Sequence, residues 1–365
     1  MSFTDARTIP SAVAMMRYIG SKAATLPAIQ SIIETHASGA TSLCDPFAGI
    51  CTVARHFKRL GMRVETGDLL WGSYMFQLAT IALNEMPTFD RLTPTLELEA
   101  SNESCAAILS AAQKVLAWLE RSPGRPGFVT AGFSDAEGSG RRFFTQENAA
   151  RIDAVRVQIA KWRDDGLIDM LEEAYLLACL LDAADRVANT AGTYMAHLKS
   201  WSRKALKPLQ LRAIPIVNNH AQNCCSRTDA RETAKTNVDV LYLDPPYNTR
   251  DYSFYYHLPE TLVLWDGATP TGKSGVPATR RHQISDFCVR RRASSALDEL
   301  LGQSSAKFVV IHYAADGLIR HDEILDMLNG RGKAQFADLK VRSYNSRVRE
   351  ADIKAHHRIY WCDSH

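Results

Sequence analysis

Long apolar runs are absent from this sequence. None of its 365 residues lies in a stretch that reaches the roughly 18 consecutive apolar residues of a membrane helix. The most apolar helical stretch begins at Met170 and carries Glu172 and Arg186 among other charges, so it is typical of a core helix. Residues 1–18 lack a basic start followed by an apolar stretch, so we expect neither a secretion signal nor a membrane partner.

Cysteines with a metal-binding or redox spacing are also absent. None of the eight cysteines stands in a C-x-x-C pair, and the adjacent Cys224 and Cys225 are poorly placed to form a disulfide with each other. Several of the others lie inside apolar runs, where cysteine packs as a small hydrophobic residue. This usage favours a reducing, cytoplasmic location and predicts no metal site.

A large excess of charge of one sign is absent too, because the formal net charge is only +3. Bulk charge therefore does not indicate a nucleic-acid partner, but its distribution does. Residues 199–212, 279–292 and 331–349 form three basic runs with aromatic residues among them. Each run alone is equally typical of a solvated surface. Together they favour a surface that follows a phosphate backbone.

Strands and helices alternate in the parts of the chain that flank its middle. Residues 40–61 and 307–330 each show a strand, a loop and a helix, and residues 238–243 form an almost continuous apolar strand. Two further strands are expected within 335–344 and 357–362. The alternation predicts an α/β fold whose sheet is mainly parallel, with an antiparallel C-terminal pair.

Residues 85–212 are expected to form a mostly helical insertion between 1–84 and 213–365. One amphipathic helix is predicted over 147–162, with Arg156 on a face away from the apolar stripe, and a second helix over about 168–188. The Gly-, Pro- and Ser-rich stretch 121–144 is expected to be an extended or mobile loop.

Two aspartates follow expected strands directly. Ligands of parallel α/β sheets bind at the carboxyl ends of the strands, where Asp45 and Asp244 are expected. Two acids there could bind a metal, hold a ribose, or act as acid and base. Gly49 allows a ligand to approach the backbone after Asp45. The loop lacks the lysine and glycine spacing of a P-loop, so a triphosphate is not expected.

Asp244 is followed by two prolines and a tyrosine, in the string "LYLDPPYNTRDYSFYYH". Pro245 and Pro246 remove two N–H donors, so this turn presents mainly acceptors. A carboxylate, a carbonyl and a flat aromatic face together suit an amino group on a planar ring. Taken alone, the motif is equally typical of a turn with packed tyrosines.

Three motifs in this order resemble the D12-class N6-adenine DNA methyltransferases: "RYIGSK" at 17–22, "DPFAG" at 45–49 and "DPPY" at 244–247. The longer string from 244 is similar to a subgroup found in restriction-modification systems. The resemblance covers most of the α/β core. It implies a Rossmann-like fold, S-adenosylmethionine as cofactor, double-stranded DNA as partner, and methyl transfer to N6 of a flipped-out adenine.

The resemblance also implies roles for individual residues. Lys22 suits the methionine carboxylate of the cofactor by charge, and Asp68 is placed for the ribose, with Glu65 as the alternative. The full cofactor-binding set that it implies is Tyr18, Lys22, Asp45, Phe47, Ala48, Gly49, Asp68 and Asp229. The family often has a second glycine near position 51, where this chain has Cys51, so the path of this loop stays open.

The catalytic set that the resemblance implies is Asp244, Pro245, Pro246 and Tyr247. The Asp244 carboxylate and the Pro245 carbonyl would each accept one N6–H, which turns the nitrogen lone pair towards the methyl group. Tyr247 would receive the flipped base by stacking, helped by one of three further tyrosines. These are Tyr252, Tyr255 and Tyr256.

Several alternatives remain open at this point. An RNA base methyltransferase, or a non-catalytic nucleic-acid-binding protein of the same fold, would share many of these features. His257 is either a buried residue at a helix start or a group beside the base. Target recognition is expected from the insertion 85–212 and the loop 266–292, whereas the recognised sequence, a homodimer and a companion restriction endonuclease stay undetermined.

Overall fold

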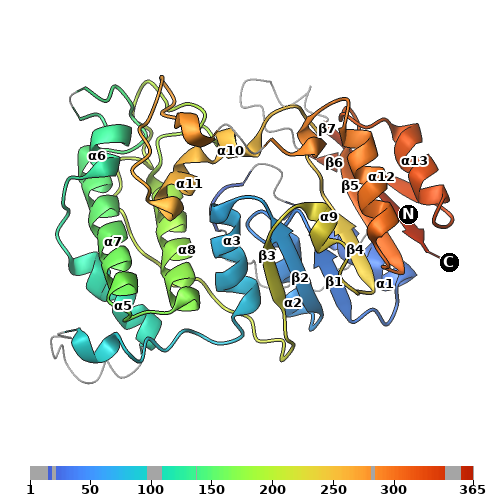
Figure 1. Cartoon of the computed structure of the whole chain (residues 1–365), viewed down its shortest axis with the longest axis horizontal. Coiled ribbons are helices and arrows are strands. Elements are labelled where there is room, and N and C mark those ends of the chain that lie inside the picture. The colour runs from blue at the N-terminus through green and yellow to red at the C-terminus, as the bar shows by residue number, and fades with distance from the viewer. Residues whose placement is uncertain are drawn as a thin grey trace.

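A seven-stranded sheet lies at one end of the molecule and a group of helices at the other (Figure 1). The computed structural model describes residues 15–18, 22–96, 109–136, 138–280, 284–341 and 355–364. Its strands are β1 (Ser42–Asp45), β2 (Arg63–Asp68), β3 (Cys224–Arg227), β4 (Val240–Leu243), β5 (Phe308–Ala314), β6 (Gln335–Val341) and β7 (Ala355–Asp363).

The strand order is β3-β2-β1-β4-β5-β7-β6. The first five strands of this order run parallel, whereas β7 is antiparallel to both β5 and β6. The predicted fold class, a mainly parallel α/β sheet with an antiparallel C-terminal part and additional helices, is confirmed.

Helices cover both faces of the sheet, which explains why β4 and β5 are buried along their whole length. One face carries α1 (Leu26–His36), α2 (Thr52–Arg59) and α3 (Trp71–Gln77), and the other carries α9 (Ala230–Thr233), α12 (Ala293–Gln303) and α13 (His321–Asn329). Alternate residues of β4 belong to the two cores: Val240 and Tyr242 to one, Leu241 and Leu243 to the other.

The helical end contains α5 (Ala111–Arg121), α6 (Phe128–Phe133), α7 (Gln146–Asp164) and α8 (Met170–Val187). A short π-helix, η1 (Leu78–Ala82), and a 3₁₀ turn, η2 (Thr93–Thr95), precede them. Side-chain caps fix three of the helix starts. Asp169 caps α8 and Ser110 caps α5, each in a capping box, and Thr145 caps α7.

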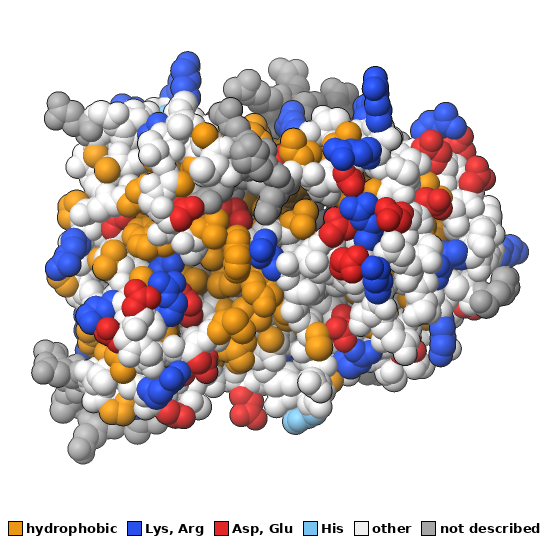
Figure 2. Space-filling model, in the orientation of Figure 1, with side chains coloured by type: hydrophobic (Ala, Val, Ile, Leu, Met, Phe, Trp, Pro, Cys, Tyr) orange, Lys and Arg blue, Asp and Glu red, His pale blue; other side chains and the backbone are white. Residues whose placement is uncertain are grey.

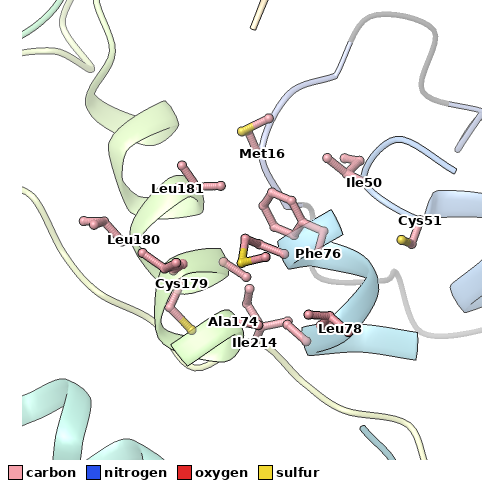
Figure 3. Close-up of a cluster of buried hydrophobic side chains, with 14 of the residues drawn as sticks. Met16, Ile50, Cys51, Phe76, Leu78, Ala174, Cys179, Leu180, Leu181 and Ile214 are labelled. Atoms are coloured by element: carbon pink, nitrogen blue, oxygen red, sulfur yellow. The ribbon is translucent and has the colours of Figure 1, made fainter. Parts of the chain in front are cut away.

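The helical end and one face of the sheet share a single hydrophobic core. Phe76 of α3 points towards α8, which carries Cys179 and Leu181, and Leu78 belongs to the same cluster (Figure 3). The same cluster contains Ile50, from the loop after β1, so the packing of the helices also supports that loop. On the face seen in Figure 2, hydrophobic side chains gather over α3 and α8, between the sheet and the helices.

The Gly- and Pro-rich stretch 121–144 differs from the expectation of an extended loop, because it contains α6 and buries Val129 and Phe143. The reason is Asp153 on α7. Its carboxylate accepts hydrogen bonds from the backbone N–H groups of Gly127, Val129 and Thr130, at 2.7–2.9 Å. A partner far along the chain thus satisfies the donors at the start of this helix.

Arg156 also lies differently from the expectation, because it is completely buried. Its guanidinium donates to the carbonyls of Leu262 and Val263 and lies 5.2 Å from the ring centre of Trp265. Those residues belong to or follow α11 (His257–Leu264), which comes after α10 (Tyr252–Tyr255). Residues of and after α11 therefore cover a face of α7 that the spacing of its apolar residues predicts to be exposed to solvent.

The chain after the D-P-P-Y turn packs on the helical end. Glu260 of α11 accepts hydrogen bonds from the N–H groups of Trp71 and Gly72 and so caps α3. Arg141 donates to the carbonyls of Pro270 and Gly272. Two 3₁₀ turns, η3 (Ala278–Arg280) and η4 (Asp286–Cys288), return the chain to the sheet. Within the described part of the chain, every helix is too short or too polar to cross a membrane.

Candidate active site

A pocket lies at the carboxyl ends of β1, β2, β3 and β4, where the sequence predicts ligand binding. Its empty space, with the open mouth included, is about 960 Å³. Among its lining residues are ten of the twelve predicted site residues: Tyr18, Lys22, Asp45, Phe47, Ala48, Gly49, Asp68, Asp229, Asp244 and Pro246.

Tyr18 forms one wall of the pocket. Its ring stacks on that of Tyr256, with the centroids 4.4 Å apart and the planes 7° from parallel. A Cβ atom added to Gly49 would lie 2.7 Å from Cε1 of Tyr18, so only glycine fits between this ring and the turn. Lys22 from the same motif also lines the pocket, whereas residues 19–21 lie outside the described part.

The loop after β1 is tied to the end of β2 by Asp68. One carboxylate oxygen of Asp68 accepts from the N–H of Gly49 and the other from the N–H of Leu70, each at 2.9 Å. Gly49 and Cys51 both have a positive φ, 52° and 61°. Position 51, where the family often has glycine, thus adopts a backbone conformation that favours glycine. The loop keeps this path with cysteine there.

The positions of Asp68 and Glu65 in β2 determine which of the two carboxylates can reach a ligand in the pocket. Asp68 is the last residue of β2 and lines the pocket. Glu65 lies earlier in β2, and its carboxylate pairs with Arg63 away from the pocket lining. Asp229 follows β3, caps α9 and pairs with Arg231 at 2.8 Å. Burial tends to raise the pKa of Asp229, but the hydrogen bonds and charge of Arg231 outweigh it and hold that pKa below its usual value.

Acidic groups outnumber basic ones among the lining residues that the structure describes. Five aspartates line the pocket, and Lys22 is the one cation among the described residues there. Asp45 is only 2% exposed, and its Oδ1 has no hydrogen-bond partner among the described residues. Burial, followed by the charge of Asp244, raises the pKa of Asp45 to about 8. Burial also raises the pKa of Asp68. The empty pocket is therefore suited to a ligand that carries positive charge.

Lys22 binds the carboxylate of the D-P-P-Y motif. Its Nζ donates to Oδ2 of Asp244 at 2.5 Å, and the lysine is only 5% exposed. Burial raises the pKa of Asp244, and Lys22 opposes this effect without cancelling it. Oδ1 of Asp244 accepts no hydrogen bond from the described residues, so it remains available to a donor from a ligand.

Pro246 lines the pocket, whereas Pro245 is buried and, like Tyr247, is not among the lining residues. The Tyr247 ring is half-buried on the side of β5 and β7, and meets the ring of His357 at 5.6 Å and 75°. The D-P-P-Y turn thus has two sides. Asp244 and Pro246 line the pocket, whereas Tyr247 contacts His357 of β7.

The three further tyrosines differ in exposure. Tyr252 is half-buried and lines the pocket. Tyr255 and Tyr256 are only 3% and 1% exposed, so they belong to the core and offer no free face to a base. His257 is completely buried, and its Nε2 lies 2.8 Å from the carbonyl of Tyr194. It is a packed residue at the start of α11, away from the pocket lining.

Sequence reasoning missed a part of the lining that comes from residues 285–288. Ser285, Phe287 and Cys288 close one side of the pocket, and the Phe287 ring meets Phe47 edge-on at 4.9 Å. The prediction placed this stretch in a recognition loop. A string such as "SDFC" carries no periodicity or motif that indicates a pocket wall, so only the fold reveals it.

The strand order, the pocket at the strand ends and the D-P-P-Y turn are those of a methyltransferase fold. More narrowly, the family model described as D12 class N6 adenine-specific DNA methyltransferase matches residues 18–327. The chain belongs to this family, and the resemblance found in the sequence is confirmed.

Curated relatives have names from restriction-modification systems. The chain is 32% identical over 355 residues to the type II methyltransferase M.FokI of Planomicrobium okeanokoites, covering 95% of this chain and 52% of that protein. It is 31% identical over 335 residues to the type II methyltransferase M.NlaIII of Neisseria lactamica, covering 91% and 93%. The modification methylase StsI of Streptococcus sanguinis is 29% identical over 347 residues, covering 94% and 50%. The chain thus spans about half of M.FokI and of StsI, and nearly all of M.NlaIII.

Proposed function

We propose that this protein transfers a methyl group from S-adenosylmethionine to N6 of an adenine in a specific site of duplex DNA. The observation that carries the proposal is the D-P-P-Y turn. It presents a fixed carboxylate to a pocket of cofactor size, and the pocket has an excess of acidic groups. Membership of the family supports the choice of base and of nucleic acid.

S-adenosylmethionine carries a positive sulfonium and a positive ammonium, which suits a pocket lined by five aspartates. We assign the methionine end to Asp45 and the turn Phe47–Gly49, where Asp45 has a buried oxygen that lacks a hydrogen-bond partner among the described residues. We assign the ribose to Asp68 and the adenine end to the region of Asp229. When bound, the cofactor supplies an electrophilic methyl group. Tyr18 shields this part of the pocket from water.

The target amine is assigned to the open oxygen of Asp244 and the carbonyl of Pro245. The N6 lone pair of adenine is delocalised into the ring, so it is a weak nucleophile. Two acceptors that each hold one N6–H draw the nitrogen towards tetrahedral geometry and free its lone pair for attack. Positive charge then grows on N6, and the fixed carboxylate of Asp244 stabilises it where water is excluded. No separate histidine base is required.

An adenine inside a duplex cannot reach Asp244, so it must leave the stack. Flipping a base out costs on the order of a few kcal/mol, and stacking on one aromatic side chain returns about 1–3 kcal/mol. The Tyr247 ring is only half-buried, and burial followed by the charge of Asp244 raises its pKa to about 12, so the ring lies close to the carboxylate assigned to the amine and still exposes part of its surface. We therefore assign the stacking role to Tyr247.

The DNA-binding surface is assigned to two regions. Arg290 and Arg291 are exposed directly after η4, whose residues form a wall of the pocket, and they are placed to bind phosphates. The helical insertion 85–212, joined by the segment 265–280 that packs on α6, is the candidate for base recognition, and 1–84 with 213–365 forms the catalytic part. The names of the relatives support a role in a restriction-modification system, beside a companion restriction endonuclease.

The direct test uses labelled cofactor and the two nucleic acids. The protein is incubated with methyl-labelled S-adenosylmethionine and either duplex DNA or RNA, and DNA from expressing cells is sequenced for modified bases. We expect label in DNA only, and N6-methyladenine at one short sequence that disappears in Asp244→Asn. Asp322→Asn changes an exposed aspartate and serves as the matched control. Label in RNA with unmodified DNA would refute the proposal and favour the RNA enzyme.

A further inference from the structure

Two histidines lie together beneath Tyr247, and the mechanism above uses neither of them. His312 belongs to β5 and is completely buried, and His357 belongs to β7 and is half-buried. Nε2 of His312 lies 3.1 Å from Nδ1 of His357. The register pairs His357 with Ala314, so the two imidazoles are diagonal neighbours on one face of the antiparallel pair.

The direction of this hydrogen bond follows from the surroundings of His312. Its Nδ1 is buried and has no hydrogen-bond partner among the described residues. A buried N–H without an acceptor is rarer than an acceptor without a donor. We therefore assign the proton of His312 to Nε2, which donates to Nδ1 of His357. This leaves His357 with its own proton on Nε2.

Both imidazoles are neutral at physiological pH. Burial, and then the positive charge of Lys22, lowers the pKa of His312 well below its usual value. The same two causes lower the pKa of His357 to about 4, although the charge of Asp316 opposes them. A hydrogen bond between two ring nitrogens also requires one of them to be unprotonated. The pair thus adds no positive charge beside Asp244.

The exposed end of the pair contacts the base-stacking tyrosine. The rings of His357 and Tyr247 meet at 5.6 Å and 75°, an edge-to-face contact. The two prolines before Tyr247 fix the backbone of the turn, but they do not fix the rotation of the tyrosine ring. His357 restricts that rotation from one side, and His312 in turn holds His357 in place.

We propose that His312 and His357 are positioning residues, which hold the Tyr247 ring ready to stack on the flipped adenine. Neither touches the cofactor or the reacting atoms. The inference rests on the proposed function, and it adds the strands β5 and β7 to the elements that receive the base. It also gives a role to a pair in which Nδ1 of His312 is buried without a hydrogen-bond partner among the described residues, an arrangement that costs stability in comparison with apolar side chains.

The test follows base flipping by fluorescence. Flipping is followed on a duplex with the site mapped by sequencing, in which 2-aminopurine replaces the target adenine, and kcat/KM is measured on the unmodified duplex because 2-aminopurine has no N6 amino group. We expect His357→Ala to reduce both the fluorescence increase and kcat/KM for DNA by roughly three- to tenfold, the range of one aromatic contact. Cofactor affinity, measured by calorimetry, stays at the wild-type value because His357 does not line the pocket.

Two further variants separate the ring from the hydrogen bond. His357→Phe keeps an edge towards Tyr247 and is expected to recover most of the signal, whereas His357→Asn keeps an acceptor for His312 but no ring and is expected to resemble His357→Ala. Thermal unfolding of all three shows that they are folded. The positioning role is overturned if the wild type methylates DNA and His357→Ala has the same fluorescence increase and kcat/KM as the wild type. It is also overturned if His357→Ala loses cofactor affinity by the same factor as it loses kcat/KM. A wild type that methylates nothing overturns the proposed function instead.

Discussion

The ammonium of Lys22 and the carboxylate of Asp244 form a buried ion pair, 2.5 Å between Nζ and Oδ2, with 6% and 19% of the side chains exposed. The two residues are 222 positions apart in the sequence. The lysine thus holds one oxygen of the carboxylate and leaves the other without a hydrogen bond from the described residues, open to the proposed target amine. Its charge also opposes the effect of burial, which raises the pKa of Asp244. Orientation and ionisation of the proposed catalytic carboxylate therefore both depend on Lys22.

Replacing Lys22 by methionine should damage catalysis itself as well as cofactor binding. Without the ammonium, the pKa of Asp244 rises further, so the carboxylate is protonated up to a higher pH. We expect kcat to fall on the order of 100-fold near neutral pH, as for loss of one electrostatic group. The acidic limb of the kcat profile should move to higher pH. Lys235→Met, at an exposed lysine, is the control. An unshifted profile with only a weaker cofactor affinity would assign Lys22 to the cofactor alone.

Gly49→Ala should weaken cofactor binding through Tyr18. The new Cβ would lie 2.7 Å from Cε1 of that ring, so the ring must leave its stack with Tyr256. We expect the Kd for S-adenosylmethionine to rise by at least about tenfold in calorimetry, since the pocket wall moves. Gly61→Ala separates the causes, because Gly61 also has a positive φ but no atom within 4 Å of the added Cβ. It should reduce stability by about 1 kcal/mol and leave Kd unchanged. Equal effects of the two variants would point to backbone strain alone.

Local sequence was sufficient for the sheet and insufficient for features that depend on distant partners. The apolar residues of β4 and the aspartates after β1 and β4 were predicted because a buried parallel strand and its carboxyl end have a local signature. The helix α6 was missed because its start is capped by Asp153, more than 20 residues later. Burial of Arg156 was missed because α11, about 100 residues later, covers it. Periodicity locates a helix but not the second layer above it.

The buried Arg156 predicts a difference in stability between two cations of α7. Arg156→Met leaves the carbonyls of Leu262 and Val263 without their charged donor and removes the contact with Trp265. We expect the free energy of unfolding to fall by about 2–3 kcal/mol, as for hydrogen bonds to charged groups. Lys161→Met removes an exposed pair with Asp165 and should cost less than about 0.5 kcal/mol. Urea denaturation of both variants measures this. Similar midpoints would mean that the free energy needed to bury the charge of Arg156 cancels the free energy that its hydrogen bonds contribute.

Arg290 and Arg291 predict a salt-dependent contribution to DNA affinity. Both are exposed beside the pocket wall formed by η4. If each binds one phosphate, the double alanine variant should reduce the slope of log K against log salt by about 1.8, which is 0.9 for each contact. Fluorescence anisotropy at several salt concentrations gives the slope. Arg320→Ala, at an exposed arginine that pairs with Asp322, should leave it unchanged. An unaltered slope in the double variant would move the phosphate contacts elsewhere.

Asp45 should make cofactor binding and protein stability depend on pH in opposite directions. Its pKa in the empty pocket is about 8, above the value of about 4 expected in the unfolded chain. The folded state therefore holds this proton more tightly, and its stability should decline as pH rises from about 4 to about 8. Asp45→Asn removes the buried charge, so we expect it to be more stable than the wild type near pH 8. Thermal unfolding across this range provides the measurement.

The same carboxyl group should release a proton when the cofactor binds. Near neutral pH Asp45 is mostly protonated in the empty pocket, and a cationic ligand next to it lowers its pKa and favours the carboxylate. Affinity for S-adenosylmethionine should therefore rise from about pH 6 to about pH 8 and then level off, with a limiting slope of about one log unit for each pH unit. Calorimetry in two buffers of different ionisation enthalpy should give different binding enthalpies for the wild type and equal ones for Asp45→Asn. Equal enthalpies in the wild type would show that Asp45 is already ionised in the empty pocket. Lys22 and the N–H of Phe47, which lower its pKa, would then outweigh burial and the charges of Asp244 and Asp68, which raise it.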